Sequence, residues 1–183
     1  MGGRRAEAGH SLVELLVAMA VMGLLMAATL SLLQSGLAAW GWGVGRVESQ
    51  QAVRAALERM ARELREAGYD PTGAGIEAVL VAESARLVFQ RDLNGNGLID
   101  PTRERVTYLL RPSETTLRRD AGGGAQPLAE RVRRFALFYL DRDGVPTTDP
   151  ERIASVRIEI EAGRAGPEAT MATLVTLRNG PIW

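Results

Sequence analysis

The sequence predicts an α+β protein in which a long N-terminal helix packs against a head made mostly of antiparallel β-sheet. The first observation is a stretch from Leu15 to Gly45 without any charged side chain, followed by an amphipathic helical pattern that ends at Ala67. The second is a change past Pro71 to short segments in which polar and apolar residues alternate, as in strands with one buried face. At 183 residues, the chain is long enough for one membrane segment and one domain of ordinary size.

Composition excludes several classes of function. The chain has 22 basic and 22 acidic residues, so it carries no net charge that would draw the whole molecule to nucleic acid or acidic lipid. It has no cysteine, which excludes Cys-ligated metal centres and a lipid-modified cysteine anchor. The single histidine is His10, so a Ser–His–acid triad is not expected. We therefore expect a protein that is not an enzyme and that requires no cofactor.

The N-terminal segment predicts a membrane anchor. A leader peptide, residues 1–9, carries two arginines and precedes an apolar transmembrane or filament-core helix, residues 10–39. This helix is longer than the roughly 20 residues that cross a bilayer, and its basic end is expected to stay in the cytoplasm. The alternative is a cleavable secretory signal, with small residues for a cut site at Ala27–Ala28 or Ser35–Ala38.

A single acid stands at the head of the apolar run. Placing the carboxylate of Glu14 in lipid without a partner would cost on the order of 2 kcal/mol or more. An acid at this place, together with the length of the run, argues against an ordinary secretory signal.

The segment Gly9–Leu15 resembles the processing motif of type IV prepilins and type II secretion pseudopilins. The resemblance implies that a prepilin peptidase cuts directly after Gly9 and then methylates the new N-terminus at His10, where the family usually has Phe or Met. It also implies that Glu14 is an assembly contact. Its carboxylate would pair with the positively charged N-terminus of a neighbouring subunit, and the pair would form only when subunits assemble.

Residues 40–68 are predicted to continue the helix as an amphipathic segment. Apolar residues recur at helical spacing on one face, and Gly68 lies where glycine commonly ends a helix. Three alternate glycines in Gly41–Gly45 would weaken or kink the helix, and a loop that joins two separate helices is the alternative. The stretch Ala52–Gly73 is similar to the segment that follows the membrane helix in PilW-like minor pilins.

Residues 69–183 are predicted to form a β-rich globular head. The expected strands are Ala78–Ala82, Arg86–Gln90, Val106–Leu110, Thr115–Arg118, Phe135–Leu140, Val156–Ile160 and Ala172–Leu177. A short helix is expected at Leu128–Val132, and a turn at Asp143–Gly144. The resemblance to PilW-like minor pilins and to the J-type minor pseudopilins of type II secretion implies a pilin-like arrangement, with the helix covering one face of the sheet.

The loop between the second and third expected strands is a candidate calcium site. Oxygen ligands stand at the spacing of a calcium-binding loop, with the backbone carbonyl of one residue completing the set: Asp92, Asn94, Asn96, Leu98 and Asp100. The twelfth position is Arg103 instead of glutamate, and Glu104 follows it. The alternative is a hairpin connection rich in Asn and Gly that needs no metal. Any Ca²⁺ would have a structural role in the head.

Basic residues cluster in the second half of the chain. Arg131, Arg133 and Arg134 could hold the phosphates of nucleic acid if they converged with other arginines on one face. Acidic residues nearby favour an ordinary solvated face instead, so DNA is a possible partner that we do not favour.

Together these features predict a minor pilin, a structural and assembly subunit of a type IV pilus or a related filament system. It would lie in the inner membrane as a single-pass protein with a cytoplasmic N-terminus, and later in the pilus at the cell surface. Its expected partners are other major and minor pilins, the prepilin peptidase, the inner-membrane assembly platform and the membrane. The alternatives are a pseudopilin of type II secretion, a pilin-anchored adhesin or DNA-uptake module, and a plain single-span protein with an extracytoplasmic β domain.

Overall fold

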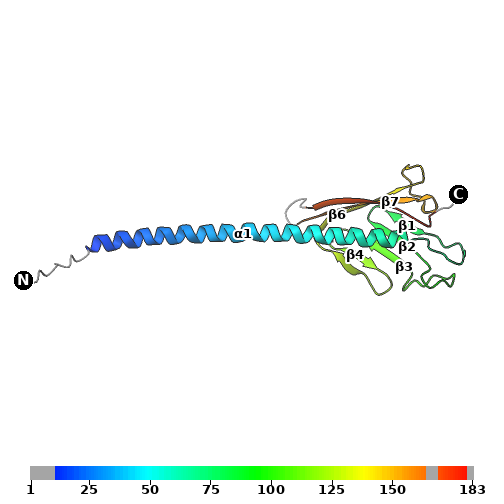
Figure 1. Ribbon diagram of the computed structural model, residues 1–183, viewed down its shortest axis with the longest axis horizontal. Helices are drawn as coiled ribbons and strands as arrows, with labels where there is room; N and C mark the ends of the chain where they lie inside the picture. The colour runs from blue at the N-terminus through cyan, green and yellow to red at the C-terminus, as the bar shows by residue number, and fades with distance from the viewer. Residues whose placement is uncertain (1–10, 164–168, 181–183) are drawn as a thin grey trace, which may run out of the picture. The chain divides into compact units, whose positions relative to one another are not determined.

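The computed structural model describes residues 11–163 and 169–180, and at residues 42–46 it describes the backbone alone. One α-helix, α1 (Leu12–Arg65), leads into eight strands and a short 3-10 helix (Figure 1). The chain divides into two units, Met1–Val44 and Gly45–Trp183, and α1 contributes residues to both.

The backbone of α1 is helical throughout its 54 residues, including Gly41–Gly45. The alternative of a loop joining two helices is therefore wrong. Each glycine in a helix interior costs only about 1 kcal/mol relative to alanine, and the helix continues through all three glycines of this segment.

The first part of α1 is apolar and exposed. Leu12–Gly41, 30 residues, is long and apolar enough to cross a membrane by length and composition. Every described side chain from Ser11 to Gly41 is exposed within this unit. Contact of such an apolar surface with water is unfavourable, so we expect lipid or other apolar helices to cover it.

The second part of α1 is amphipathic and supplies one wall of the head's core. Its buried face consists of Val53, Ala56, Leu57, Met60, Ala61 and Leu64. The helix ends before Gly68, which has a φ of 72° and donates its backbone N–H to the carbonyl of Gln90 at 2.9 Å. A Cβ added at Gly68 would lie 2.5 Å from the carbonyl oxygen of Asn179, so both the backbone conformation and the space require glycine here.

A five-stranded antiparallel sheet follows, with the strand order β1-β2-β3-β4-β5. Its strands are β1 (Val79–Glu83), β2 (Arg86–Gln90), β3 (Arg105–Leu109), β4 (Leu117–Asp120) and β5 (Gln126–Ala129). The register places Leu87 opposite Tyr108, and both side chains are fully buried.

A second antiparallel sheet has the order β6-β7-β8. It consists of β6 (Val132–Leu140), β7 (Ser155–Ala162) and β8 (Ala169–Thr176), and the 3-10 helix η1 (Pro150–Arg152) precedes β7. Backbone hydrogen bonds join β6 to connecting segments of the first sheet: Val132 donates to the carbonyl of Thr115, and Leu137 donates to that of Ser84, each at 2.8 Å.

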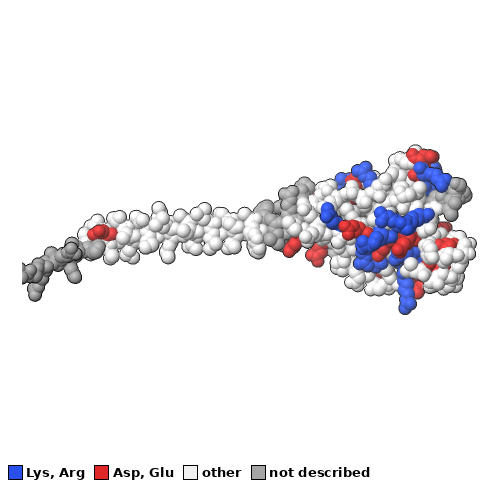
Figure 2. Space-filling view, viewed as in Figure 1, with Lys and Arg blue, Asp and Glu red and all other residues white. Residues whose placement is uncertain are grey.

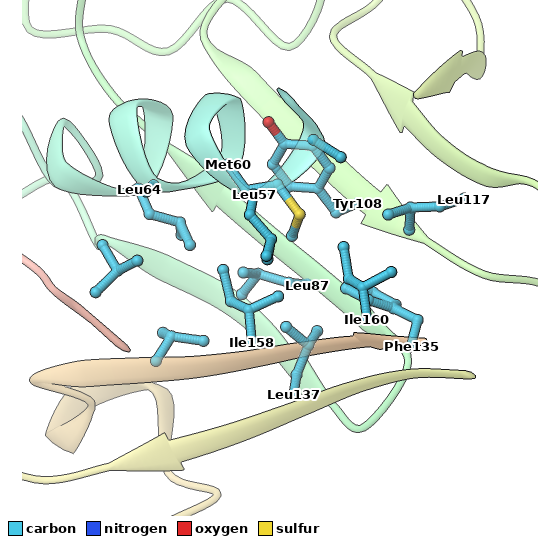
Figure 3. Close-up of a cluster of buried hydrophobic side chains, with 14 of the residues drawn as sticks. Leu57, Met60, Leu64, Leu87, Tyr108, Leu117, Phe135, Leu137, Ile158 and Ile160 are labelled. Atoms are coloured by element: carbon cyan, nitrogen blue, oxygen red, sulfur yellow. The ribbon is translucent and has the colours of Figure 1, made fainter. Parts of the chain in front are cut away.

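The core lies where α1 and the two sheets meet. In Figure 3, Leu57, Met60 and Leu64 point from α1 towards side chains that rise from both sheets. Tyr108 and Phe89 of the first sheet have their ring centroids 6.1 Å apart, and Ile158 and Ile160 of the second sheet are fully buried. The predicted α+β fold with a helix against antiparallel sheet is confirmed.

Two details of the predicted head are corrected. The β-rich region forms two sheets instead of one. The short helix expected at Leu128–Val132 is wrong, because Gln126–Ala129 pairs with β4 as β5 and Val132 begins β6. Between these strands Arg131 has a φ of 58°, a left-handed conformation that cannot continue a right-handed helix.

Candidate functional site

The start of α1 is the first candidate site. Gly9 and His10, the expected processing residues, lie outside the described residues. Glu14 lies in the first turn of α1, where a negative charge is favoured by the helix dipole. The hydroxyl of Ser11 accepts the backbone N–H of Val13 at 3.3 Å, so a polar side chain caps the helix directly before the apolar run.

Glu14 is separated from other charges along the chain. In Figure 2, the long stretch of α1 is white except for red near its start. No charged residue follows Glu14 until Arg46. Within the described part of the molecule no ion pair involves Glu14, so an anion stands at one end of an exposed apolar surface and could be paired from outside.

A second polar cluster fastens α1 to the first sheet. Arg119 on β4 donates its Nε to both carboxylate oxygens of Glu63 at 2.9 and 3.1 Å. The hydroxyl of Tyr108 donates to Glu63 at 2.6 Å, and Arg59 donates at 3.1 Å. We call these four residues the Glu63 cluster.

The Glu63 cluster is partly buried, and its ionisation reflects that position. Burial alone would raise the pKa of Glu63, but the hydrogen bonds from Arg119, Tyr108 and Arg59 outweigh it and hold the pKa below its usual value. Burial is the main cause that raises the pKa of Tyr108, and the hydrogen bond to Glu63 raises it further. The cluster links the helix to the sheet through ion pairs and hydrogen bonds. It contains no group suited to nucleophilic or acid–base catalysis near neutral pH.

The candidate calcium loop is held by two buried carboxylates. Asp92 is fully buried and accepts backbone N–H groups from Gly95, Asn96 and Gly97 at 2.7 to 3.2 Å. Glu104, 2% exposed, accepts N–H groups from Leu93 and Asn94 on one oxygen and from Asp100 on the other. These amides give each carboxylate three donors, which explains how two acids stay buried in this loop.

The sequence predicts Asp92 as a metal ligand. It does not indicate that the carboxylates of Asp92 and Glu104 accept hydrogen bonds from backbone N–H groups. Among the described residues, no group of three or more acidic, histidine or cysteine side chains is placed to hold a metal ion. The expected site relied partly on Asn side chains and a carbonyl, so calcium binding stays a prediction. Asn94 and Asn96 each accept the N–H two residues further on, as in Asx turns.

Calcium binding predicts a metal-dependent change in stability. Adding millimolar Ca²⁺ to the full chain in detergent should raise its Tm, and a chelator should reverse the rise. If the Ca²⁺ concentration is 100 times the Kd, the gain is about 2.7 kcal/mol. Asn96→Ala, which removes a proposed ligand but no buried carboxylate, should weaken the response. Equal melting curves with Ca²⁺ and with chelator would contradict the hypothesis.

The expected basic patch is only partly brought together. Arg133 and Arg134 are adjacent and exposed at the start of β6, whereas Arg131 is half-buried. Arg134 lies opposite Glu161 in the ladder between β6 and β7. Arg118 and Arg111 instead form ion pairs with Glu114, with N···O distances of 3.1 and 3.3 Å. Acidic residues next to these arginines agree with an ordinary solvated face, which the sequence favours. DNA binding stays a prediction.

Comparison with known proteins agrees with the N-terminal site. Residues 4–30 match the family model described as the prokaryotic N-terminal methylation motif. No curated protein matches the chain. The match contains Gly9, His10 and Glu14, and it implies processing by a prepilin peptidase and assembly with pilins. The motif is thus joined to a pilin-like architecture in which a long helix with an apolar start packs, further along, on antiparallel sheet.

Proposed function

We propose that this methylation-motif protein of pilin-like architecture is a minor pilin, which helps to start the assembly of a type IV pilus or a related filament and is placed at or near the filament tip. The prepilin peptidase removes residues 1–9, and Glu14 then guides docking by pairing with the N-terminus of a neighbouring subunit. The similarity of Ala52–Gly73 to PilW-like minor pilins supports the minor subtype.

The observation that carries the proposal is the placement of the motif on α1. The matched residues 4–30 overlap an exposed apolar helix, and the same helix continues into the core of a β-rich head. An exposed apolar helix can be buried by lipid before assembly and by other subunits' helices afterwards, because both environments exclude water from it. Before assembly the protein is an inner-membrane prepilin with its head outside the cytoplasm.

The mature N-terminus tests the processing step. Mass analysis of the protein from cells that have the prepilin peptidase should give a chain that begins at His10, with a methyl group on its terminus. The same protein from cells without the peptidase should retain residues 1–9. Gly9→Ala should give the unprocessed mass in both kinds of cell, because the residue before the cut is changed. A mature terminus that is the same in all four samples would contradict the assignment.

A further inference from the structure

A groove lies along the free edge of the second sheet. It has a volume of about 520 Å³ and is lined by α1 residues between Arg54 and Arg65 and by Met171, Ala172 and Thr173 of β8. Side chains of consecutive strand residues point to opposite faces, so three consecutive residues line a groove only when it follows the strand's edge. Figure 1 shows the orange-red strand of residues 169–176 running beside α1.

The edge of β8 lacks the features that usually protect a free strand. All eight of its residues pair with β7 without a register shift, and none is charged or proline. It pairs with no other strand that the structure describes.

The other sheet edges are protected. β5 has only four residues and contains Pro127 and a register shift. β1 has a register shift and lies against η1. The outer side of β6 is bonded to Ser84 and Thr115. The open edge of β8 is therefore an exception among the described strands, and an uncapped edge is suited to pairing with another strand.

The α1 wall of the groove is positively charged. Arg54, Arg62 and Arg65 line it together with a single acid, Glu58, and all four side chains are exposed. None of the ion pairs found within the described residues involves these three arginines. Arg59, which lies outside the groove on the same helix, is paired with Glu63. The groove therefore has an excess of unpaired positive charge.

The spacing of these charges matches an extended chain. Arg54 and Arg62 are separated by about 12 Å along the helix axis, at 1.5 Å per residue. Side chains on one face of a strand recur about every 6.7 Å, so the first and fifth residues of a strand are about 13 Å apart. In a strand bound along the groove, acids at the first and fifth residues would face Arg54 and Arg62. A basic residue at the third would face Glu58.

We propose that this groove binds an extended acidic segment of another protein subunit, which adds to β8 as a fourth strand and pairs its carboxylates with Arg54 and Arg62. Backbone hydrogen bonds to the edge of β8 supply the register, and the arginines select an acidic over a basic segment. This contact concerns the head alone, so it goes beyond the role of Glu14 and does not depend on processing at Gly9.

A synthetic peptide tests the proposal with the full chain in detergent micelles. The peptide has Glu at its third and seventh positions, Lys at its fifth, and Thr or Val elsewhere. A charge-swapped peptide exchanges Glu and Lys. The unmodified protein should bind the first peptide at least tenfold more tightly than the second. Arg54→Glu with Arg62→Glu should reverse this preference, whereas the matched pair Arg133→Glu with Arg134→Glu should leave it unchanged.

Methylation of the peptide's backbone nitrogens tests strand pairing separately from charge. The N–H groups of odd-numbered residues point to one edge of a strand and those of even-numbered residues to the other. Methylating one set should abolish binding, and methylating the other should preserve it. Equal binding of the two methylated peptides, no binding of the parent peptide at millimolar concentration, or binding of duplex DNA instead through Arg54 and Arg62 would overturn the proposal.

Discussion

Glu14→Ala is expected to leave processing at Gly9 intact and to reduce incorporation into the filament at least tenfold. The substitution removes the carboxylate that is proposed to pair with a neighbouring N-terminus, and a charge-assisted hydrogen bond is worth about 1.5–3 kcal/mol. A loss of about 1.4 kcal/mol lowers an association constant tenfold. The measurement is the ratio of this protein in sheared filaments to that in membranes, together with the mass of the N-terminus.

The matched control for Glu14 is Glu48→Ala. Glu48 is also an exposed acid on α1, but it lies beyond the apolar stretch. Its replacement should leave incorporation unchanged. Glu14→Gln keeps the size of the side chain and removes its charge, so it should behave like Glu14→Ala. Normal incorporation of both Glu14 variants would show that the acid is not an assembly contact.

Glu63→Gln is expected to destabilise the head by about 2 kcal/mol and to lower its Tm by roughly 5 °C. The substitution removes the charge that holds Arg119, whose side chain is 18% exposed, and leaves a guanidinium poorly compensated between helix and sheet. Thermal melting of the full chain in detergent measures the change. Glu114→Gln is the surface control, because Glu114 also binds two arginines but is more exposed; it should lower the Tm less than Glu63→Gln does.

The difference between wild type and Glu63→Gln should depend on pH. Because the pKa of Glu63 is lower in the folded chain than in the unfolded one, its stabilisation is complete above the usual glutamate pKa of about 4.3. It is lost as the pH falls through the lower folded pKa. The two melting temperatures should therefore differ at pH 7 and converge in acid. A difference that stays constant with pH would contradict an ionic role for Glu63.

Periodicity predicted the elements that depend on local pattern. The face of α1 with Leu57, Met60 and Leu64 is buried as its helical spacing indicates, and Arg86–Gln90 forms β2 with the predicted limits. Burial of one face imposes these patterns on the sequence, so they can be recognised without knowledge of the partners.

Long-range pairings could not be predicted in the same way. Glu63 and Arg119 are 56 residues apart, and in the sequence each resembles any other charged residue of an amphipathic element. The division into two sheets depends on which strands meet across loops, which a strand pattern does not specify. For Glu104, the local signal was visible as an acid one residue beyond the calcium spacing, but its bonds to backbone amides depend on the shape of the loop.

The burial of α1 within the head has a practical consequence for producing a soluble form of this protein. Removing the whole helix as a membrane anchor would also remove Val53, Met60 and Leu64, which are completely buried against the two sheets. The remaining strands would expose their inner faces and would be expected to aggregate. A soluble version should therefore be cut inside the helix, upstream of Val53, so that the head keeps the segment that completes its interior.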